Sequence, residues 1–174
     1  MSEIPDATAD APEEARLWHV AHTRPRAEKK LAAFCTEKGL ECQLPLYRSV
    51  KRYRGKRVVF LKPLFPGYVF VRIARNQRLL LQQNSHVANL LDVPDQAEFE
   101  QQLEDILRAL DSDMEITVAP EIRPGVRVHI RSGPLRGMDA WVESRGKIAD
   151  VHIRLDFIGQ AAVVKVQAED LELS

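Results

Sequence analysis

Hydrophobic and polar positions alternate along residues 17–110 with two different periods. Period-two runs predict strands, and apolar residues three and four positions apart predict amphipathic helices. The first such helix has Leu31 and Cys35 on its apolar side and stops at Gly39. The predicted elements are, in chain order, a strand at 17–23, a helix at 26–39, a strand at 41–47, a hairpin at 51–61 around Arg54-Gly55, strands at 64–73 and 86–91, and a helix at 98–110. This order is that of the split βαβ fold.

The pattern changes near residue 123, where strict alternation begins. Val126, Val128 and Ile130 are separated by polar residues, and Gly133 and Gly137 bracket a turn. Further strand-like segments follow at 138–144, 149–155 and 161–166. About fifty residues of short strands without helical periodicity predict a small β-barrel. The fold class expected for the whole chain is α+β: a split βαβ antiparallel sheet with helices, followed by a small five-stranded β-barrel.

Composition places the chain among globular proteins and divides it into four parts. Of its 174 residues, 45% are hydrophobic and 29% are charged, which is too apolar for a disordered chain. Residues 1–16, rich in Ala, Pro and acids, are expected to form a disordered tail. Residues 111–122 are acidic, contain Pro120 and are expected to form a linker. One domain is therefore expected at 17–110 and a second at 123–174.

Targeting signals and cysteines indicate where such a protein works. No apolar run is long enough for a membrane helix, and the acidic N-terminus does not resemble a signal peptide. Two cysteines, Cys35 and Cys42, are too few for a disulfide framework or a metal knuckle. We therefore expect a cytoplasmic protein with reduced cysteines and no contact with a membrane.

The charges cancel overall but are strongly zoned along the chain. Residues 17–90 carry a formal net charge of +12, and residues 91–122 carry −9. A segment this basic can hold a polyanion by displacing its counterions. The alternative is a solvated surface with uneven charge. The size of the imbalance favours nucleic acid as the partner.

The predicted hairpin concentrates this positive charge. Residues 48–62 contain seven basic side chains and no acid. Phosphate contact would explain that density on a protruding ribbon, with Arg52, Arg54 and Lys56 nearest the turn. The alternative is an exposed strand edge that Lys and Arg keep unpaired.

The run Leu-Phe-Pro-Gly-Tyr-Val-Phe-Val at 64–71 is the most informative in the chain. On a strand, Tyr68 and Phe70 point to one face, and Val69 and Val71 point to the other. If helices cover only the aliphatic face, the aromatic side chains are left partly exposed, as in a binding surface. The alternative is that Tyr68 and Phe70 are ordinary core residues.

Candidate catalytic and metal-binding residues are few. His19 and His22 lie three apart on a predicted strand and therefore face opposite sides, which argues against a shared metal. No Ser, Cys or His stands in a recognisable nucleophile motif, and the acids cluster in the predicted tail and linker. We expect a protein that is not an enzyme and uses no metal or cofactor.

Three features in this order resemble NusG-type transcription elongation factors. They are a Trp-x-Val strand with a following helix at 18–39, the run at 64–71, and Gly-Val-Arg-Val-x-Ile-x-x-Gly-Pro-Leu-x-Gly at 125–137. The resemblance covers about residues 17–173 and implies an N-terminal NGN domain and a C-terminal KOW domain. The short chain and its divergent first helix are more similar to a specialised paralogue of the RfaH or capsule-operon type than to the housekeeping factor.

The resemblance implies a monomeric elongation and antitermination factor that bridges the DNA cleft of RNA polymerase and suppresses pausing or termination. It matches the following residues to the patch that grips the β′ clamp helices: Leu64, Phe65, Pro66, Gly67, Tyr68 and Phe70. It matches Gln77, Arg78 and Leu79 to the segment facing the β gate loop, although the His-Thr-Thr of RfaH is absent there.

The resemblance also implies contacts with nucleic acid and with a further protein. Non-template DNA in the transcription bubble would meet Arg24, Arg26, Lys30, Gln82, Gln83, Asn84 and His86. The KOW motif comprises Val126, Val128, Gly133, Pro134, Leu135 and Gly137 and would recruit a ribosomal protein or a termination factor. The customary Gly after Asp139 is replaced by Ala140, so the partner surface can differ.

An RNA-recognition motif is the rival interpretation, because it shares the split βαβ plan. Its signature is matched by Gly67, Tyr68, Phe70 and Val71 and departs from the sequence at Pro66, Val69 and Ile73. A chain of that class would bind single-stranded RNA without polymerase.

RfaH-like relatives can refold the second domain between a helical hairpin and a barrel. In this chain, period-two alternation and β-branched residues such as Val163, Val164 and Val166 favour strands. Gly133, Pro134 and Gly137 would break a helix. We therefore expect a constitutive barrel, free on its linker, that leaves the polymerase patch open.

Overall fold

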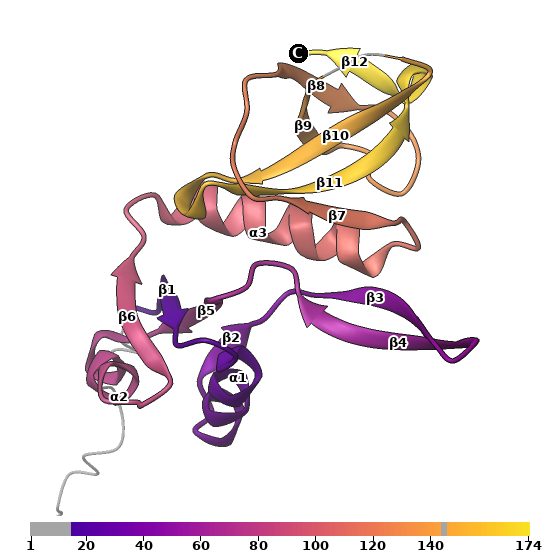
Figure 1. The fold of residues 1–174 in the computed structure, drawn as a ribbon. Coiled ribbons are helices and arrows are strands. Elements are labelled where there is room, and N and C mark those ends of the chain that lie inside the picture. The colour runs from indigo at the N-terminus through magenta and orange to yellow at the C-terminus, as the bar shows by residue number, and fades with distance from the viewer. Residues whose placement is uncertain (1–14, 144–145) are drawn as a thin grey trace, which may run out of the picture.

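The computed structural model describes residues 15–143 and 146–174, and it confirms the α+β fold class (Figure 1). The expected tail at 1–16 lies outside the described residues except for its last two. No helix of the described part is long and apolar enough to cross a membrane. The N-terminal part contains β1 (Leu17–Thr23), α1 (Glu28–Glu37), β2 (Glu41–Gln43), β3 (Leu46–Tyr53), β4 (Lys56–Pro63), β5 (Tyr68–Ile73), α2 (Arg78–Gln82), β6 (Val87–Asp92) and α3 (Gln96–Asp111).

The first sheet is antiparallel, with strand order β2-β5-β1-β6. In the β1–β5 pair, Val20 lies opposite Phe70. The helices α1 and α2 cover one face of this sheet because their apolar sides and the aliphatic positions of the strands bury one another. The buried residues of this first core include Ala21, Leu31, Cys35, Val69, Val71 and Leu81.

The helix α3 covers the other face of the sheet. The ring of Phe99 lies 5.9 Å from that of Trp18 and 5.5 Å from that of Phe70, measured between centroids. Phe70 is 0% exposed. The expectation of a partly exposed aromatic face is therefore wrong for Phe70, because the sheet is covered on both faces and not on one.

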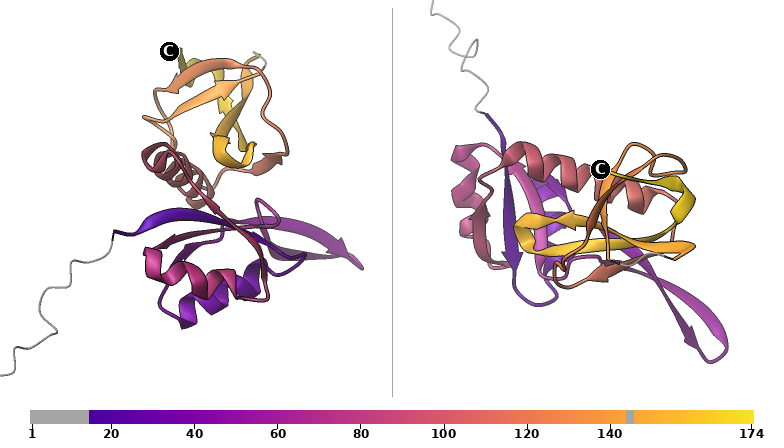
Figure 2. Two further views of the ribbon diagram at one scale, coloured as in Figure 1. Left: turned by 90° about the vertical axis from the view of Figure 1, so that its left-hand side faces the viewer. Right: turned by 90° about the horizontal axis from the view of Figure 1, so that it is seen from above.

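The strands β3 and β4 form a hairpin that projects beyond the sheet (Figures 1 and 2). Its register places Val50 opposite Val59, and its turn at Arg54-Gly55 has φ values of +47° and +76°. Two positive φ values are those of a type I′ turn, so the predicted turn is confirmed. The segment predicted as one strand at 41–47 is interrupted near Pro45, which cannot donate a backbone hydrogen bond to a neighbouring strand. Its last residues belong to β3, so the hairpin is longer than expected.

The C-terminal strands form a six-stranded antiparallel sheet with order β12-β8-β9-β10-β11-β7. The strands are β7 (Ile116–Ala119), β8 (Val126–Ile130), β9 (Asp139–Val142), β10 (Ile148–Leu155), β11 (Gln160–Gln167) and β12 (Leu171–Leu173). Five of them lie in the range expected for the barrel. The sixth, β7, lies within the expected linker and pairs with β11, because the β-branched run from Ile116 to Val118 has strand propensity that the acidic composition concealed.

The helix α3 lies between the two sheets and contacts both (Figures 1 and 2). The rings of Phe99 and Phe157 meet edge to face at 6.3 Å, and Gln102 exchanges two hydrogen bonds with Asp156, at 2.5 and 2.9 Å. Arg108 donates to the carbonyl of Arg136 at 2.6 Å. The expectation of a barrel free on a linker is therefore wrong for this structure, because apolar residues of α3 belong to one buried cluster with residues of both sheets.

Candidate functional site

The run at 64–70 forms a tight turn at the start of β5. The N–H of Tyr68 donates to the carbonyl of Phe65 at 3.3 Å, and between them Pro66 and Gly67 occupy the corners. Gly67 has φ +89°, which suits the third residue of a type II turn after proline. The turn leaves Pro66 exposed and Tyr68 half-buried.

Two other segments are fastened to this turn. The N–H of Thr23 donates to the carbonyl of Gly67 at 2.8 Å, and the N–H of Gly67 donates to the carboxylate of Glu28 at 2.9 Å. The ring of His22 stacks on that of Tyr68 with centroids 5.4 Å apart and an interplanar angle of 29°. Apolar and aromatic groups therefore meet at one end of the sheet.

The same end of the sheet carries basic side chains. The backbone N–H of Arg24 donates to the carbonyl of His86 at 2.9 Å, and its guanidinium donates to the carbonyl of Ser85 at 3.0 Å. Arg26 is exposed with φ +60°, and Lys30 is exposed on α1. We name the exposed or half-buried group around the turn the turn surface: it comprises His22, Arg24, Arg26, Pro66, Tyr68 and His86.

Three of the residues matched to the clamp-binding patch belong to the core instead. Leu64 and Phe65 are buried, as is Phe70, and the rings of Phe65 and Phe70 lie 6.3 Å apart. Their side chains are therefore inaccessible in this structure, because they pack in one apolar cluster with residues of α3. Pro66, Gly67 and Tyr68 are the accessible part of the motif.

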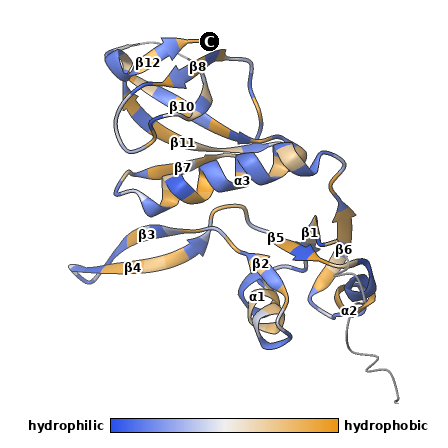
Figure 3. Cartoon of the chain, turned by 180° about the vertical axis from the view of Figure 1, so that it is seen from behind, coloured by the Kyte–Doolittle hydropathy of each residue, from blue (hydrophilic) through white to orange (hydrophobic). Residues whose placement is uncertain are grey.

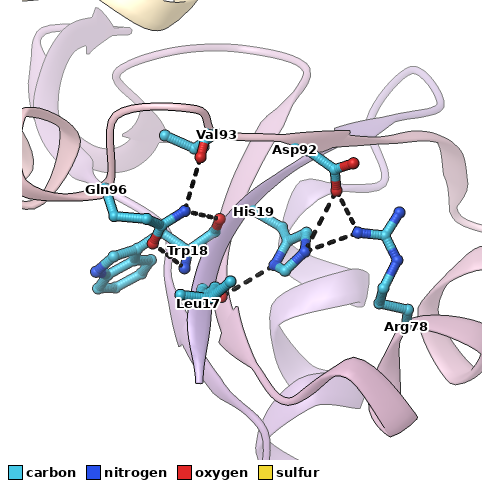
Figure 4. Close-up of polar contacts among 7 residues, drawn as sticks. All are labelled: Leu17, Trp18, His19, Arg78, Asp92, Val93 and Gln96. Atoms are coloured by element: carbon cyan, nitrogen blue, oxygen red, sulfur yellow. Dashed lines mark hydrogen bonds and ion pairs between the residues drawn. The ribbon is translucent and has the colours of Figure 1, made fainter. Parts of the chain in front are cut away.

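A polar cluster of buried His19, partly buried Arg78 and exposed Asp92 holds the start of α2 (Figure 4). The Nδ1 of buried His19 lies 2.9 Å from the carbonyl oxygen of Leu17, so this nitrogen carries the hydrogen. The Nη1 of Arg78 donates to the Nε2 of His19 at 2.9 Å and also to the carboxylate of Asp92. Hydrogen bonding to Arg78 holds the pKa of Asp92 below its usual value.

This cluster changes the roles of two residues matched to the gate-loop segment. The guanidinium of Arg78 donates hydrogen bonds to His19 and Asp92. The side chain of Gln77 accepts a hydrogen bond from the N–H of Ala74 at 2.9 Å. Both side chains therefore have partners within the chain. Leu79 points outward and is 59% exposed. Gln82 and Gln83 are also exposed at the end of α2, and Asn84 accepts from the N–H of His86 at 2.8 Å.

The hairpin presents its charge to solvent. Arg52, Arg54 and Lys56 are all exposed near its tip. Hydrogen bonding to Lys51 and repulsion from its charge lower the pKa of Lys62. Such crowding of like charges would be relieved by a bound anion. The strand β4 also has hydrophobic positions (Figure 3). Val59, Phe60 and Leu61 on this strand are exposed.

The turn of the second domain has the expected geometry. Gly133 and Gly137 have φ values of +88° and +89°, and the N–H of Gly137 donates to the carbonyl of Ile130 at 2.8 Å. Leu135 and Val128 are buried, and Pro134 is exposed. Val126 is 49% exposed, so the predicted inward alternation begins only at Val128. In β8, the buried side chains are therefore those of Val128 and Ile130, and the first residue of the strand lies outside the core.

Comparison with known proteins gives the family. The family described as "Transcription termination factor nusG" matches residues 16–116. The chain belongs to the NusG family. NusG-family proteins are transcription factors that bind RNA polymerase, and they are not enzymes.

Solved structures show the same fold in a family member. A structure described as "Domain interaction in Thermotoga maritima NusG" has a TM-score of 0.50 at 18% identity, covering 91% of this chain and 97% of that one. A chain of the "MjSpt4:Spt5 complex" matches at 18% identity over 90% of this chain and 96% of that one, with a TM-score of only 0.27. A search of curated protein sequences gave no significant match.

Sequence reasoning missed several residues that shape this NusG-family site. Glu28 fixes the turn through Gly67, and His22 supports Tyr68. His19 and Asp92 position α2. Only the opposite-face placement of His19 and His22 was visible in the sequence, and it is confirmed, since His19 is buried and His22 is exposed. The partners of these residues are distant along the chain, which local patterns do not report.

Proposed function

We propose that this NusG-family protein is a transcription elongation and antitermination factor that binds the RNA polymerase clamp through the turn surface. The observation that carries the proposal is the junction of an exposed Pro66 and a half-buried Tyr68 with the basic residues Arg24 and Arg26. An aromatic and apolar centre beside cations is the composition of a protein interface that lies next to a polyanion.

Bridging across the DNA cleft would come from α2. Leu79 is outward and its helix is held by His19, Arg78 and Asp92, so a contact with the β gate loop would be rigid. A factor that binds the closed, elongating polymerase better than the paused one shifts the population toward elongation. Suppression of pausing and termination follows from that difference in affinity.

The nucleic-acid contacts would lie on two neighbouring structures. Arg24, Arg26 and Lys30, with the loop at 82–86, would face non-template DNA in the bubble. Arg52, Arg54 and Lys56 at the hairpin tip would contact duplex phosphates, since a two-stranded ribbon fits a groove of DNA. These contacts would add affinity that falls with salt.

The C-terminal sheet is proposed to be a KOW domain that recruits a ribosomal protein or a termination factor. Its strands and the turn at 133–137 support this assignment, and a specialised RfaH-like role remains part of the proposal. The barrel's contacts with α3 through Phe157 suit a closed arrangement of the two domains. The Thermotoga maritima relative is likewise described by its domain interaction.

The RNA-recognition alternative is disfavoured by burial. An RNA-recognition motif stacks bases on aromatic side chains of an open sheet face. Here Phe70 lies under α3, so the central aromatic of that signature is inaccessible.

Binding to polymerase tests the proposal directly. Tyr68→Ala in the full chain should weaken binding to core RNA polymerase by roughly thirty-fold, because an aromatic at an interface centre is worth ~2 kcal/mol. Tyr53→Ala is the matched control, since Tyr53 lies exposed at the hairpin tip and core polymerase without DNA should not sense it. Equal affinity of wild type and a folded Tyr68→Ala variant would refute the assignment.

A further inference from the structure

The projecting hairpin of β3 and β4 has two faces of different composition. Residues directly opposite each other in an antiparallel pair share a face, and successive residues of a strand alternate between faces. The face with the Val50–Val59 pair, which we name the Val59 face, also carries Arg48, Arg57 and Leu61. The face with the Ser49–Phe60 pair, which we name the Phe60 face, also carries Tyr47, Lys51, Tyr53, Lys56 and Lys62.

The Val59 face borders a cleft that has an acidic wall. The cleft has a volume of about 960 Å³, and its hairpin side includes Arg48, Val50 and Leu61. The opposite side is formed by residues 110–117, whose acids are Asp111, Asp113 and Glu115. A polyanion that entered this cleft would meet these carboxylates, so the Val59 face is the less favourable one for nucleic acid.

The Phe60 face carries cations that no carboxylate neutralises. Within residues 15–143 and 146–174, no ion pair joins an acid to any of the seven basic side chains at 48–62, whereas Arg72 and Arg78 of the same domain each pair with an acid. Hydrogen bonding to Lys51 and repulsion from its charge lower the pKa of Lys62, which lies on the same face. This face therefore has positive charge available for an anionic ligand.

Aromatic rings lie along the Phe60 face with a cation between them. Tyr53 is 65% exposed and Phe60 is 41% exposed. Because Phe60 lies opposite Ser49, the two rings start roughly 13 Å apart along the strand direction, and Lys51 is the residue of β3 between them on this face. Exposed rings among cations are typical of surfaces that stack unpaired bases and hold the backbone by charge. A duplex keeps its bases paired, so it would use the cations and leave the rings without a partner.

We propose that the Phe60 face binds single-stranded RNA, with Tyr53 and Phe60 stacking on bases and Lys51 and Lys62 contacting phosphates. The choice of RNA rests on the proposed function, in which the non-template strand and duplex DNA already have sites, so the transcript is the single strand that lacks one. The site differs from that of an RNA-recognition motif, which uses aromatic residues of its main sheet. Here Phe70 of that sheet is buried under α3.

Binding of a short fluorescent oligouridine by the full chain, measured by anisotropy without polymerase, tests the proposal. Phe60→Ala should weaken binding about fivefold or more, because it removes a ring on which a base stacks. Leu61→Ala is the matched control and should leave the affinity unchanged, since Leu61 is the adjacent exposed residue and lies on the Val59 face. Phe60→Trp should keep the affinity. Equal affinities of wild type and folded Phe60→Ala, or equal losses in the Ala variants at Phe60 and Leu61, would overturn the proposal.

Duplex RNA of the same length separates stacking from charge. Phe60→Ala should leave the affinity for the duplex unchanged. Lys51→Gln combined with Lys62→Gln should weaken the binding of both ligands, and on the single strand each lost phosphate contact should reduce the slope of log affinity against log salt by about 0.7. An equal loss for duplex and single strand in Phe60→Ala would show that the ring does not stack on a base, and the proposal would fail.

Photocrosslinking in an elongation complex identifies the source of the single strand. A photoreactive uridine in the transcript should crosslink to the hairpin, as mapped by mass spectrometry. Crosslinks to the hairpin from the non-template DNA strand alone would overturn the assignment to RNA. Tyr68→Ala should lose polymerase binding and keep its affinity for free oligouridine, because Tyr68 lies outside the hairpin. Failure of the proposed function and failure of this inference therefore give different results.

Discussion

At the scale of single residues, the motif at 64–70 combines buried residues that pack in the core with accessible residues that we propose contact polymerase. Phe65 and Phe70 bury their rings between the sheet and α3, whereas Pro66 and Tyr68 remain accessible. Adjacent residues of one short run therefore have different consequences when they are changed. A loss of polymerase binding at Phe70 would report unfolding, and the same loss at Tyr68 would report a lost contact.

Phe70→Ala is expected to destabilise the protein by about 3–5 kcal/mol, because it leaves a cavity beside Phe65 and Phe99. Urea denaturation measures the change in the free energy of unfolding. Phe70→Leu is the matched control and should cost less, since it keeps most of the apolar volume. A Phe70→Ala variant as stable as wild type would show that the ring is not part of the core.

Asp105→Asn is expected to raise the free energy of unfolding at pH 7 by less than about 1 kcal/mol. Burial raises the pKa of Asp105 above its unfolded value, so its charge opposes folding at every pH above the folded pKa. The gain should shrink as pH falls and vanish below the unfolded pKa, where both side chains are neutral. The amide can still accept the hydrogen bond from Gln101. Chemical denaturation of both proteins between pH 3 and 7 measures the difference in their free energies of unfolding. A difference that does not change with pH would show that the charge of Asp105 is not its cause.

At the scale of elements, the hairpin is the part least supported by the rest of the fold. Its tip residues are exposed, and its base is tied to α1 by the ammonium of Lys29, which donates to the carbonyl of Leu61 at 2.7 Å. Exposed apolar side chains on β4 lie between the cations. This combination suits a ligand that offers both phosphates and apolar edges, as a DNA groove does.

Reversal of Arg52, Arg54 and Lys56 to Glu should flatten the dependence of DNA affinity on salt. Each phosphate contact on duplex DNA adds about −0.9 to the slope of log affinity against log salt. Titration of polymerase–DNA complexes with the full chain at several salt concentrations measures the slope. Reversal of Lys165, which is exposed in the C-terminal sheet, is the control. An unchanged slope in the hairpin variant would show that these residues do not contact phosphates and only keep an exposed strand edge solvated.

At the scale of the whole molecule, α3 is the element that contacts both sheets and so links them. It packs on the aromatic face of the first sheet and binds the second through Phe157, Asp156 and the turn at 133–137. The interface combines the Phe99–Phe157 pair and a few polar contacts with apolar side chains of α3 that belong to one buried cluster with residues of both sheets. Loss of the Phe157 ring and of the Gln102 hydrogen bonds would weaken this interface, because both lie at the contact between α3 and the C-terminal sheet.

Phe157→Ala combined with Gln102→Ala should release the C-terminal sheet from α3. The expected result is a larger radius of gyration in solution scattering, while amide chemical shifts at 148–155 and 160–167 keep their strand values. Ile148→Ala is the control, because Ile148 is an exposed residue of β10. Unchanged scattering would mean that other contacts hold the interface. Helical shifts in the second domain would contradict a constitutive barrel.

Local patterns predicted much of this fold and less of the site. Alternation predicted most strands of both sheets, although not β7 or β12, and Arg54-Gly55 predicted the hairpin turn, because these features depend on neighbouring residues. Burial of Phe70 was one of two alternatives that the local pattern left open, since the outcome depends on where α3 docks. The cluster of His19, Arg78 and Asp92 was missed for the same reason: its members are brought together only by the sheet.

The position of α3 in the chain has a consequence for synthesis on the ribosome. The first sheet is complete in sequence at Asp92, but the helix that covers its aromatic face ends only at Asp111. At about 5–20 residues per second, the intervening segment takes roughly one to four seconds to be made. During that interval Trp18 and Phe70 lack their cover, so the nascent chain offers an aromatic surface that a chaperone can bind and that the finished protein conceals.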